Sequence, residues 1–147
     1  MGSAAIQAIR KTFGSDAIII ANWYGKENPE YKIPAVDHTV FGDITQPNCL
    51  NSIQTLGGNK FDYLFYATAM GEVGFPINEA TFEQIEHSNR LSFDPLPILE
   101  EIFQIETIVT YSTFYLLKHQ LCSYGAMGHS KERIERWTVQ SGKKSRR

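Results

Sequence analysis

Three residues in the second half of the chain have the types and the spacing needed for acid–base chemistry. Ser112 follows the apolar run 108–111, which is typical of a buried strand. Tyr124 comes twelve residues later, at the start of a predicted helix, and Lys131 follows it by seven residues. Seven residues is close to two turns of about 3.6 residues each, so Tyr124 and Lys131 are expected on one helix face. A fixed positive charge lowers the pKa of a neighbouring phenol, which suits proton donation to a C=O or C=C bond that accepts hydride.

Alternating strand-like and helix-like segments predict the elements that position these residues. The polar stretch 22–34, with its Gly and two Pro, is expected to be a loop. The predicted helices cover residues 5–13, 47–56, 82–89 and 123–137, the third capped by Asn78 or Thr81. Pro95 and Pro97 either interrupt that third helix or restart a helix toward Phe103. The predicted strands cover residues 17–21, 39–41, 63–67 and 106–111. Strands that alternate with crossover helices form a parallel sheet covered on both faces, and the apolar run 17–21 fits a strand buried in this way.

Length and composition indicate one globular domain, expected over residues 1–138. The 147 residues include 42% hydrophobic and 20% charged side chains, and no apolar run approaches the length of a membrane span. The first residues lack the basic start and apolar core of a secretory signal. Cys49 and Cys122 stand outside any paired motif, which favours a reducing cytoplasm. The pI near 6.1 argues against a nucleic-acid-binding protein.

The C-terminal end is basic, with seven Lys or Arg and two Glu from Lys131 onward. Residues 139–147 are expected to form a disordered tail, because the last seven residues contain no apolar side chain. Two interpretations stay open for this tail: a solvated terminus, or an arm that binds phosphate or RNA.

Several short motifs, taken in order, resemble the short-chain dehydrogenase/reductase family over roughly residues 2–138. Gly42-Asp43-Ile44-Thr45 is similar to the family's third-strand signature, and residues 62–69 lie where its fourth strand ends in Asn-Asn-Ala-Gly. Asn89 matches the helical catalytic Asn, and Ser112, Tyr124 and Lys131 match the catalytic Ser, Tyr and Lys. The resemblance implies an α/β fold, a Rossmann-like three-layer α/β/α arrangement with a parallel sheet, here without the first strand and the C-terminal strands.

The resemblance also implies an NAD(P)-dependent reductase acting on a small-molecule ketone or enoyl thioester. In the family, Tyr124 would donate the proton, Lys131 would lower the pKa of the Tyr and hold the nicotinamide ribose, Ser112 would place the substrate oxygen, and Asn89 would support a relay water. The implied cofactor contacts are Gly2, Asn22, Trp23, Lys26, Asp43, Ile44, Ala67, Thr68, Ala69 and Lys131. The second predicted strand ends without an acidic residue, and Lys26 suits a 2′-phosphate, which favours NADP over NAD. Family members commonly pair, so a homo-oligomer is expected.

The chain departs from the family pattern in three places. Six residues separate Tyr124 from Lys131, where most members have three; six is the spacing of the enoyl-acyl-carrier-protein reductases. The second Tyr of that branch has an imperfect match, with Phe114 and Tyr115 in its region, and Tyr66-Ala67-Thr68-Ala69 replaces Asn-Asn-Ala-Gly. Gly2 is either the last Gly of a phosphate-binding turn or part of a cloning remnant.

Each candidate also has a purely structural interpretation. Tyr124 and Lys131 would then be a packed Tyr and a snorkelling Lys, Ser112 a strand-end hydroxyl, Asp43 a helix cap and Asn89 a surface amide. At the level of the whole chain, the alternative is an inactive remnant that acts as a scaffold or dimerisation module. A flavodoxin-like or response-regulator-like domain has less support, because no acidic cluster or phosphate loop follows the first visible strand. His119, Cys122 and His129 form an H-x2-C-x6-H arrangement, but zinc ligands must converge in space and His129 lies inside the predicted helix, so no metal site is expected.

Overall fold

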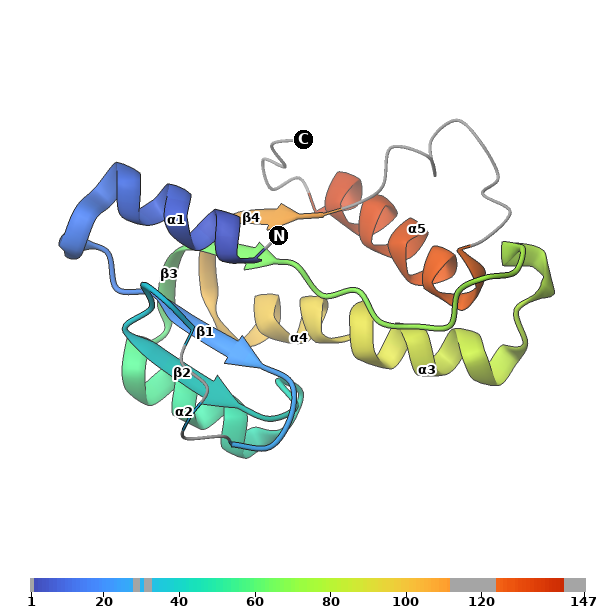
Figure 1. Ribbon diagram of the computed structural model, residues 1–147, viewed down its shortest axis with the longest axis horizontal. Coiled ribbons are helices and arrows are strands. Elements are labelled where there is room, and N and C mark those ends of the chain that lie inside the picture. The colour runs from blue at the N-terminus through green and yellow to red at the C-terminus, as the bar shows by residue number, and fades with distance from the viewer. Residues whose placement is uncertain (1, 28–29, 31–32, 112–123, 142–147) are drawn as a thin grey trace. The chain divides into compact units, whose positions relative to one another are not determined.

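A computed structural model of the chain describes residues 2–27, 30, 33–111 and 124–141 (Figure 1). The chain divides into two compact units, Met1–Phe61 and Asp62–Arg147. Each unit is an α/β arrangement in which helices alternate with strands, as the sequence predicts. No helix in the described ranges has both the length and the apolar character needed to cross a bilayer.

The first unit is built on two parallel strands. Helix α1 (Gly2–Phe13) and a short 3₁₀ turn, η1 (Gly14–Asp16), lead into β1 (Ile20–Trp23). Strand β2 (His38–Phe41) pairs with β1, with Ile20 opposite His38 and Trp23 opposite Phe41. Helix α2 (Pro47–Gly57) packs on both strands. The buried apolar side chains of this unit are Ala5, Ile19, Val40, Cys49, Leu50 and Ile53.

Turn chemistry fixes the ends of these helices. Gly14 has φ +62° directly after α1, in the left-handed region where a side chain is disfavoured. Pro47 starts α2 at the position where a missing N–H costs nothing. Gly58, at φ +73°, ends the same helix with its N–H donated to the Gln54 carbonyl at 2.8 Å.

In its described residues, the second unit contains the strand pair β3–β4 and three α-helices. Strand β3 (Lys60–Tyr66) begins at the end of the first unit and pairs with β4 (Gln104–Thr110), and the two strands run in the same direction in Figure 1. The chain between them forms η2 (Ile77–Glu79), α3 (Phe82–Ser92) and α4 (Pro95–Ile102). Helix α5 (Gly125–Gln140) packs against α3 and contacts β4. Leu96, Ile108, Ala126 and Ile134 are among its most deeply buried residues.

The start of α3 decides between the two caps that the sequence allowed. Thr81, not Asn78, is the N-cap: its hydroxyl accepts the Gln84 N–H, and the Gln84 side chain accepts the Thr81 N–H at 2.8 Å. This reciprocal arrangement satisfies two helix donors that otherwise have no partner. Pro95 then restarts the chain as a separate helix, α4, at its first position.

The predicted strand 17–21 is displaced in the structure. Strand β1 starts at Ile20 and reaches Trp23, so Asn22 and Trp23 belong to the strand and not to the predicted loop. Residues before Ile20 bond elsewhere: the Ala17 carbonyl accepts from Arg10, and Ile19 bonds the Asp37 side chain and backbone. The prediction that this run is covered on both faces is wrong for Ile18, which is 71% exposed.

The C-terminal boundary also moves. Helix α5 continues to Gln140, so Val139 and Gln140 are helical, although the sequence assigned them to the tail from 139 onward. The helix is extended because Thr138 is buried, with its hydroxyl donated to the Ile134 carbonyl and beside the Thr110 hydroxyl of β4. Residues 142–147 lie outside the described part of the chain.

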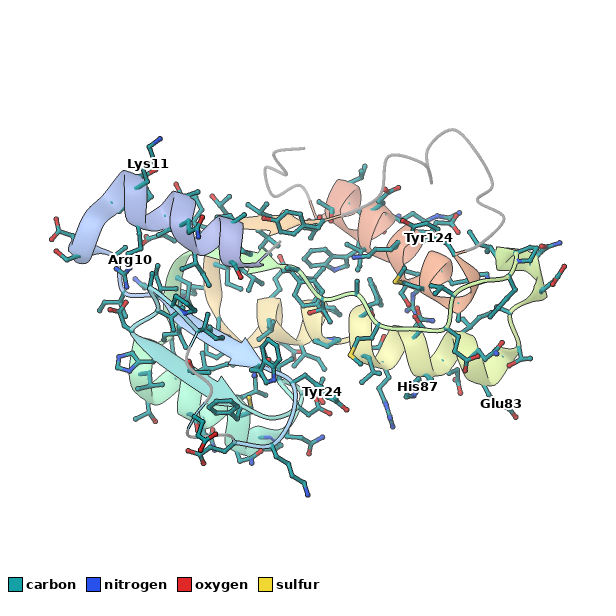
Figure 2. The ribbon with its side chains drawn as sticks, in the orientation of Figure 1. Arg10, Lys11, Tyr24, Glu83, His87 and Tyr124 are labelled. Atoms are coloured by element: carbon teal, nitrogen blue, oxygen red, sulfur yellow. The ribbon has the colours of Figure 1, made fainter. Side chains whose placement is uncertain are left out.

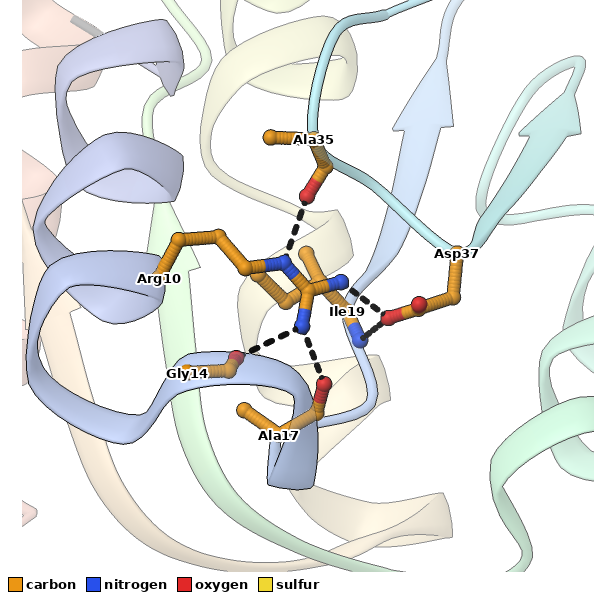
Figure 3. A network of polar contacts seen from close by, with 6 residues as sticks. All are labelled: Arg10, Gly14, Ala17, Ile19, Ala35 and Asp37. Atoms are coloured by element: carbon orange, nitrogen blue, oxygen red, sulfur yellow. Dashed lines mark hydrogen bonds and ion pairs between the residues drawn. The ribbon is translucent and has the colours of Figure 1, made fainter.

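Arg10 joins the end of α1 to the start of both strands (Figure 3). Its guanidinium donates to the carbonyls of Gly14, Ala17 and Ala35 and to the Asp37 carboxylate. The same Asp37 oxygen accepts the Ile19 N–H at 2.7 Å. These two donors, led by the backbone bond, lower the pKa of Asp37. A planar group with five donors is well suited to hold so many fixed acceptors at once.

We expect the Asp37 carboxylate to make the first unit sensitive to acid. Because its pKa is lower in the folded state, its contribution is complete above the unfolded value of about 3.9 and is lost as the pH falls through the folded value. Asp37→Asn should therefore have a lower Tm than wild type at pH 7, and the difference should shrink toward pH 3. Thermal denaturation between pH 3 and 7 measures this, with the exposed Asp16→Asn as the control. A difference that does not change with pH would contradict the assignment.

Candidate functional site

The side chain of Lys131 lies at the carboxyl ends of β3 and β4. Its ammonium donates to the carbonyl of Thr68 at 3.0 Å and to the carbonyl of Tyr111 at 2.9 Å. Thr68 follows the end of β3, and Tyr111 follows the end of β4. In open α/β sheets, ligands bind outside the carboxyl ends of the strands. Lys131 therefore occupies the edge where such a fold places its chemistry.

Lys131 is buried, with 5% of its surface exposed. Burial lowers its pKa, and nearby Glu135 opposes this shift. A buried ammonium is tolerated when its protons are hydrogen-bonded, and an ammonium has three donors. Two of them go to the described carbonyls of Thr68 and Tyr111. Among the described residues, no acceptor is seen for the third donor.

Tyr124 is the N-cap residue of α5 and is half-buried (Figure 2). Gly128 donates its N–H to the Tyr124 carbonyl at 3.0 Å, so helical hydrogen bonding begins directly at Tyr124. The structure thus agrees with the prediction that this Tyr opens the helix carrying Lys131. Met127 is the residue one helical turn before Lys131, at the more common family spacing.

The backbone carbonyls of segment 72–77 hold the start of α5. Gly125 donates its backbone N–H to the Phe75 carbonyl at 2.9 Å, and the His129 ring nitrogen Nε2 lies 3.0 Å from the Ile77 carbonyl oxygen. A Cβ on Gly125 would lie 2.5 Å from the Glu72 carbonyl oxygen, and one on Gly128 would lie 2.6 Å from the Ile77 side chain. Gly125 and Gly128 are therefore both needed to let segment 72–77 approach the start of α5. Sequence analysis did not use these glycines as a signal of close approach.

Asn89 is buried, which excludes the surface-amide interpretation. It lies on α3 with 7% exposure, facing α5, while Glu83 and His87 on the same helix point away from α5 (Figure 2). Its side-chain oxygen accepts the Ser130 hydroxyl at 3.2 Å. Its backbone carbonyl accepts the N–H groups of Phe93 and Asp94 at 2.8 and 2.9 Å. Because a carbonyl has two lone pairs, that backbone oxygen is filled.

Three fully buried serines surround Asn89, and sequence analysis missed them. Ser88 and Ser92 on α3 both bond the Met70 carbonyl at 2.8 Å, and Ser130 on α5 lies 2.7 Å from the Ser88 hydroxyl. All three have 0% exposure. The spacing of Ser88 and Ser92 by one helical turn, on the side of Asn89 that faces α5, was the available signal.

Tyr66 ends β3, at the place of the first Asn in the family's Asn-Asn-Ala-Gly segment. Its side chain is 4% exposed, and its hydroxyl has no hydrogen-bond partner among the described residues. Burial raises the pKa of this phenol well above its usual range. Tyr66 therefore remains neutral and is unsuited to acid–base exchange.

In the first unit, two predicted cofactor residues make internal bonds. The Asn22 amide donates to the carbonyls of Val40 and Gly42, both at 3.2 Å, and to Cys49 Sγ at 3.3 Å. One Asp43 oxygen accepts the N–H and the hydroxyl of Thr45, at 2.9 and 2.7 Å. Asp43 thus stabilises the turn before α2. This is a structural role, as the alternative interpretation of Asp43 expected, but the N-cap of α2 is Gln46 and not Asp43.

The remaining predicted residues have varied surroundings. Gly2, Trp23 and Lys26 are exposed, and Ile44 is half-buried, all in the first unit. In the second unit, Ala67 and Thr68 are half-buried at the end of β3, and Ala69 is exposed. Ser112, His119 and Cys122 lie outside the described residues.

No protein-family profile and no curated protein sequence matches this chain. Solved structures of similar fold include a short-chain dehydrogenase from Burkholderia cenocepacia in complex with NADP, with a TM-score of 0.66 and 12% identity. A short-chain dehydrogenase/reductase from Saccharomyces cerevisiae gives 0.65 and 19% identity, and one from Brucella melitensis gives 0.63 and 13%. Each alignment covers 95% of this chain.

The alignments cover 62%, 60% and 66% of those three structures, so the chain spans less than two thirds of their length. The similarity in fold confirms the prediction of a Rossmann-like α/β architecture that lacks part of the full sheet. With identities this low, the comparison concerns the fold and leaves the roles of individual residues to be argued from the site.

We expect removal of the Tyr66 hydroxyl to leave the protein at least as stable as wild type. A buried hydroxyl without a partner costs about 1–3 kcal/mol in desolvation, so Tyr66→Phe should raise the free energy of unfolding by up to about 1 kcal/mol. Urea denaturation measures this, with Tyr24→Phe as the exposed control. A clear loss of stability would mean that the hydroxyl has a hydrogen-bond partner, with the nearby Thr68 side chain as the first candidate.

Proposed function

We propose that this chain is the core of an NAD(P)-dependent oxidoreductase of the short-chain dehydrogenase/reductase type. It would act in the cytoplasm, as a homo-oligomer, on a ketone or an enoyl thioester. The observation that carries the proposal is the buried Lys131 ammonium, bonded to the Thr68 and Tyr111 carbonyls at the carboxyl edge of β3–β4. A desolvated cation at a strand edge is costly, and a functional site explains why it is kept there.

The described geometry suits a Lys that supports a bound nucleotide. Two donors anchor the ammonium to the backbone, and the third can bond a ribose hydroxyl without moving the side chain. A bound nicotinamide would supply hydride to the substrate carbon. Tyr124 would donate its phenolic proton to the developing oxyanion or enolate, which forms the new O–H bond and leaves Tyr124 as the phenolate. We assign Ser112 to placing the substrate oxygen.

The spacing of six residues between Tyr124 and Lys131 favours the enoyl reductase type of site. Tyr124 is the N-cap of α5 and Lys131 lies within this helix, and seven positions return to nearly the same helix face. Tyr124 caps the helix and is half-buried, so a substrate can reach its hydroxyl. Met127, one turn before Lys131, cannot donate a proton.

Each unit, taken by itself, contains residues that suit one part of a dinucleotide. In the second unit, Ala67, Thr68, Ala69 and Lys131 offer small side chains, backbone groups and one cation for the nicotinamide end. In the first unit, Trp23 and Lys26 are exposed and suit an adenine ring and a 2′-phosphate, which favours NADP. Asp43 and Asn22 would contribute mainly by shaping the strand ends, because their side chains already bond Thr45 and the β2 carbonyls.

A second candidate is a remnant that no longer catalyses and acts as a scaffold or dimerisation module. The observation that favours it is the strand pairing: the described strands form two separate two-stranded sheets. The internal bonds of Asn22 favour the same candidate, because they leave this amide no donor for a nucleotide.

Titration with NADPH and NADH separates the two candidates. If the chain is a reductase core, the nicotinamide fluorescence should saturate, and NADPH should raise the Tm. Lys131→Met should weaken NADPH binding by about 10- to 100-fold, the value of a hydrogen bond to a charged group. The exposed Lys60→Met is the matched control and should bind as wild type does. A folded protein that binds neither nucleotide would exclude the reductase and favour the remnant.

Tyr124→Phe tests the proton donor separately from binding. Removing the phenolic proton should lower kcat by about 100-fold or more, while the Kd for NADPH stays within about twofold. Reduction of crotonyl thioesters and of simple ketones, followed by NADPH absorbance, measures this. Normal turnover by Tyr124→Phe would contradict the assignment of Tyr124, whether or not the cofactor binds.

A further inference from the structure

A buried chain of hydroxyl groups connects α3, α5 and the loop after β3. The Ser88 and Ser130 hydroxyls lie 2.7 Å apart, and both side chains are fully buried. At one end, Ser88 lies 2.8 Å from the Met70 carbonyl. At the other end, Ser130 lies 3.2 Å from the Asn89 side-chain oxygen. Each hydroxyl has one proton to donate, so it is the donor in only one of its contacts.

The donors of this chain point toward Met70 and toward Asn89. Ser92 donates to the Met70 carbonyl and accepts the Met70 N–H at 2.7 Å, and Ser88 donates to the second lone pair of the same carbonyl. The Ser88 proton is then used, so the Ser130 hydroxyl is the donor that serves the Asn89 side-chain oxygen. A buried oxygen without a donor costs free energy, which makes this bond valuable.

We propose that Ser130 is a positioning residue that sets which end of the Asn89 amide faces the strand edge. With Oδ1 held by Ser130, the Nδ2 group is turned away from that hydroxyl, because the two atoms branch from one planar carbon. The Asn89 backbone carbonyl is already filled by Phe93 and Asp94. Asn89 can therefore serve a ligand through Nδ2, as a donor to an acceptor such as a water or substrate oxygen. This inference rests on the proposed reductase function, in which Asn89 supports a relay water.

Adjacency in the sequence couples this amide to the buried cation. Ser130 and Lys131 are consecutive residues of α5, yet Ser130 bonds α3 and Lys131 bonds the strand ends. A rotation of α5 that moved one side chain would break the contact of the other. Ser130 thus fixes Asn89 and the helix that carries Lys131 at the same time.

The matched pair Ser130→Ala and Ser92→Ala tests the proposal. Both serines are fully buried and lose one hydroxyl, but only Ser130 contacts Asn89. Without nucleotide, the Nδ2H₂ group of Asn89 is followed by NMR relaxation, with its signals assigned by their loss in Asn89→Asp. We expect this group to become mobile in Ser130→Ala and to stay ordered in Ser92→Ala. Ser130→Cys, which keeps a weak donor, should restore part of the order.

Binding of NADPH provides the second measurement. Ser130→Ala should raise the Kd for NADPH by about fivefold, the equivalent of one neutral hydrogen bond, while Ser92→Ala should leave it unchanged. If the wild-type chain does not bind NADPH, the proposed function fails, and the NMR comparison still decides the role of Ser130. Equal mobility of Asn89 in both alanine variants, or none in either, would overturn the proposal.

Discussion

The arrangement of the second unit depends on a buried ammonium group. Lys131 keeps its charge away from water only because the Thr68 and Tyr111 carbonyls accept its protons. Those carbonyls belong to residues just beyond β3 and β4. The Lys131 ammonium therefore fixes the position of α5 along its own axis relative to the ends of both strands. A shift of α5 by one residue, about 1.5 Å, would break this geometry. The helix must therefore approach its neighbours in one register.

The close approach of α5 explains the composition of its surroundings. Gly125 and Gly128 leave room for segment 72–77, and Gly71, at φ +145°, lies against Ser88. Between α3 and α5, the buried polar contacts are made by Ser88, Asn89 and Ser130. A fully satisfied polar interface is more specific about register than an apolar one, since each lost partner carries a penalty. Packing and polar chemistry here impose the same position on the helix.

The sequence predicted the order and type of the helices and strands better than the contacts that their side chains make. Apolar runs and the Thr81, Pro47 and Pro95 signals are local, so they located helices and strands to within a few residues. The spacing of Tyr124 and Lys131 also described the start of α5 correctly. The contacts of Lys131 with the Thr68 and Tyr111 carbonyls, and those of Ser88 and Ser92 with the Met70 carbonyl, join residues 18 to 63 positions apart. A local sequence pattern does not predict partners at such separations. Asp43 was likewise ambiguous, because a carboxylate after a strand suits a turn as well as a nucleotide.

The strand pairing bears on where a doubly wound protein binds the pyrophosphate of a dinucleotide. In a doubly wound sheet the first strand is central, in the order 3-2-1-4-5, and the turn after it holds the pyrophosphate. The described strands pair as β1 with β2 and β3 with β4, which is the pairing that remains when a central strand is not among them. The cation, the buried amide and the half-buried phenol all belong to the unit that contains β4. In the proposed reductase, the groups for proton transfer would be positioned by contacts within one unit, whereas tight nucleotide binding would depend on a phosphate-binding turn. Affinity and chemistry should respond to different parts of the chain.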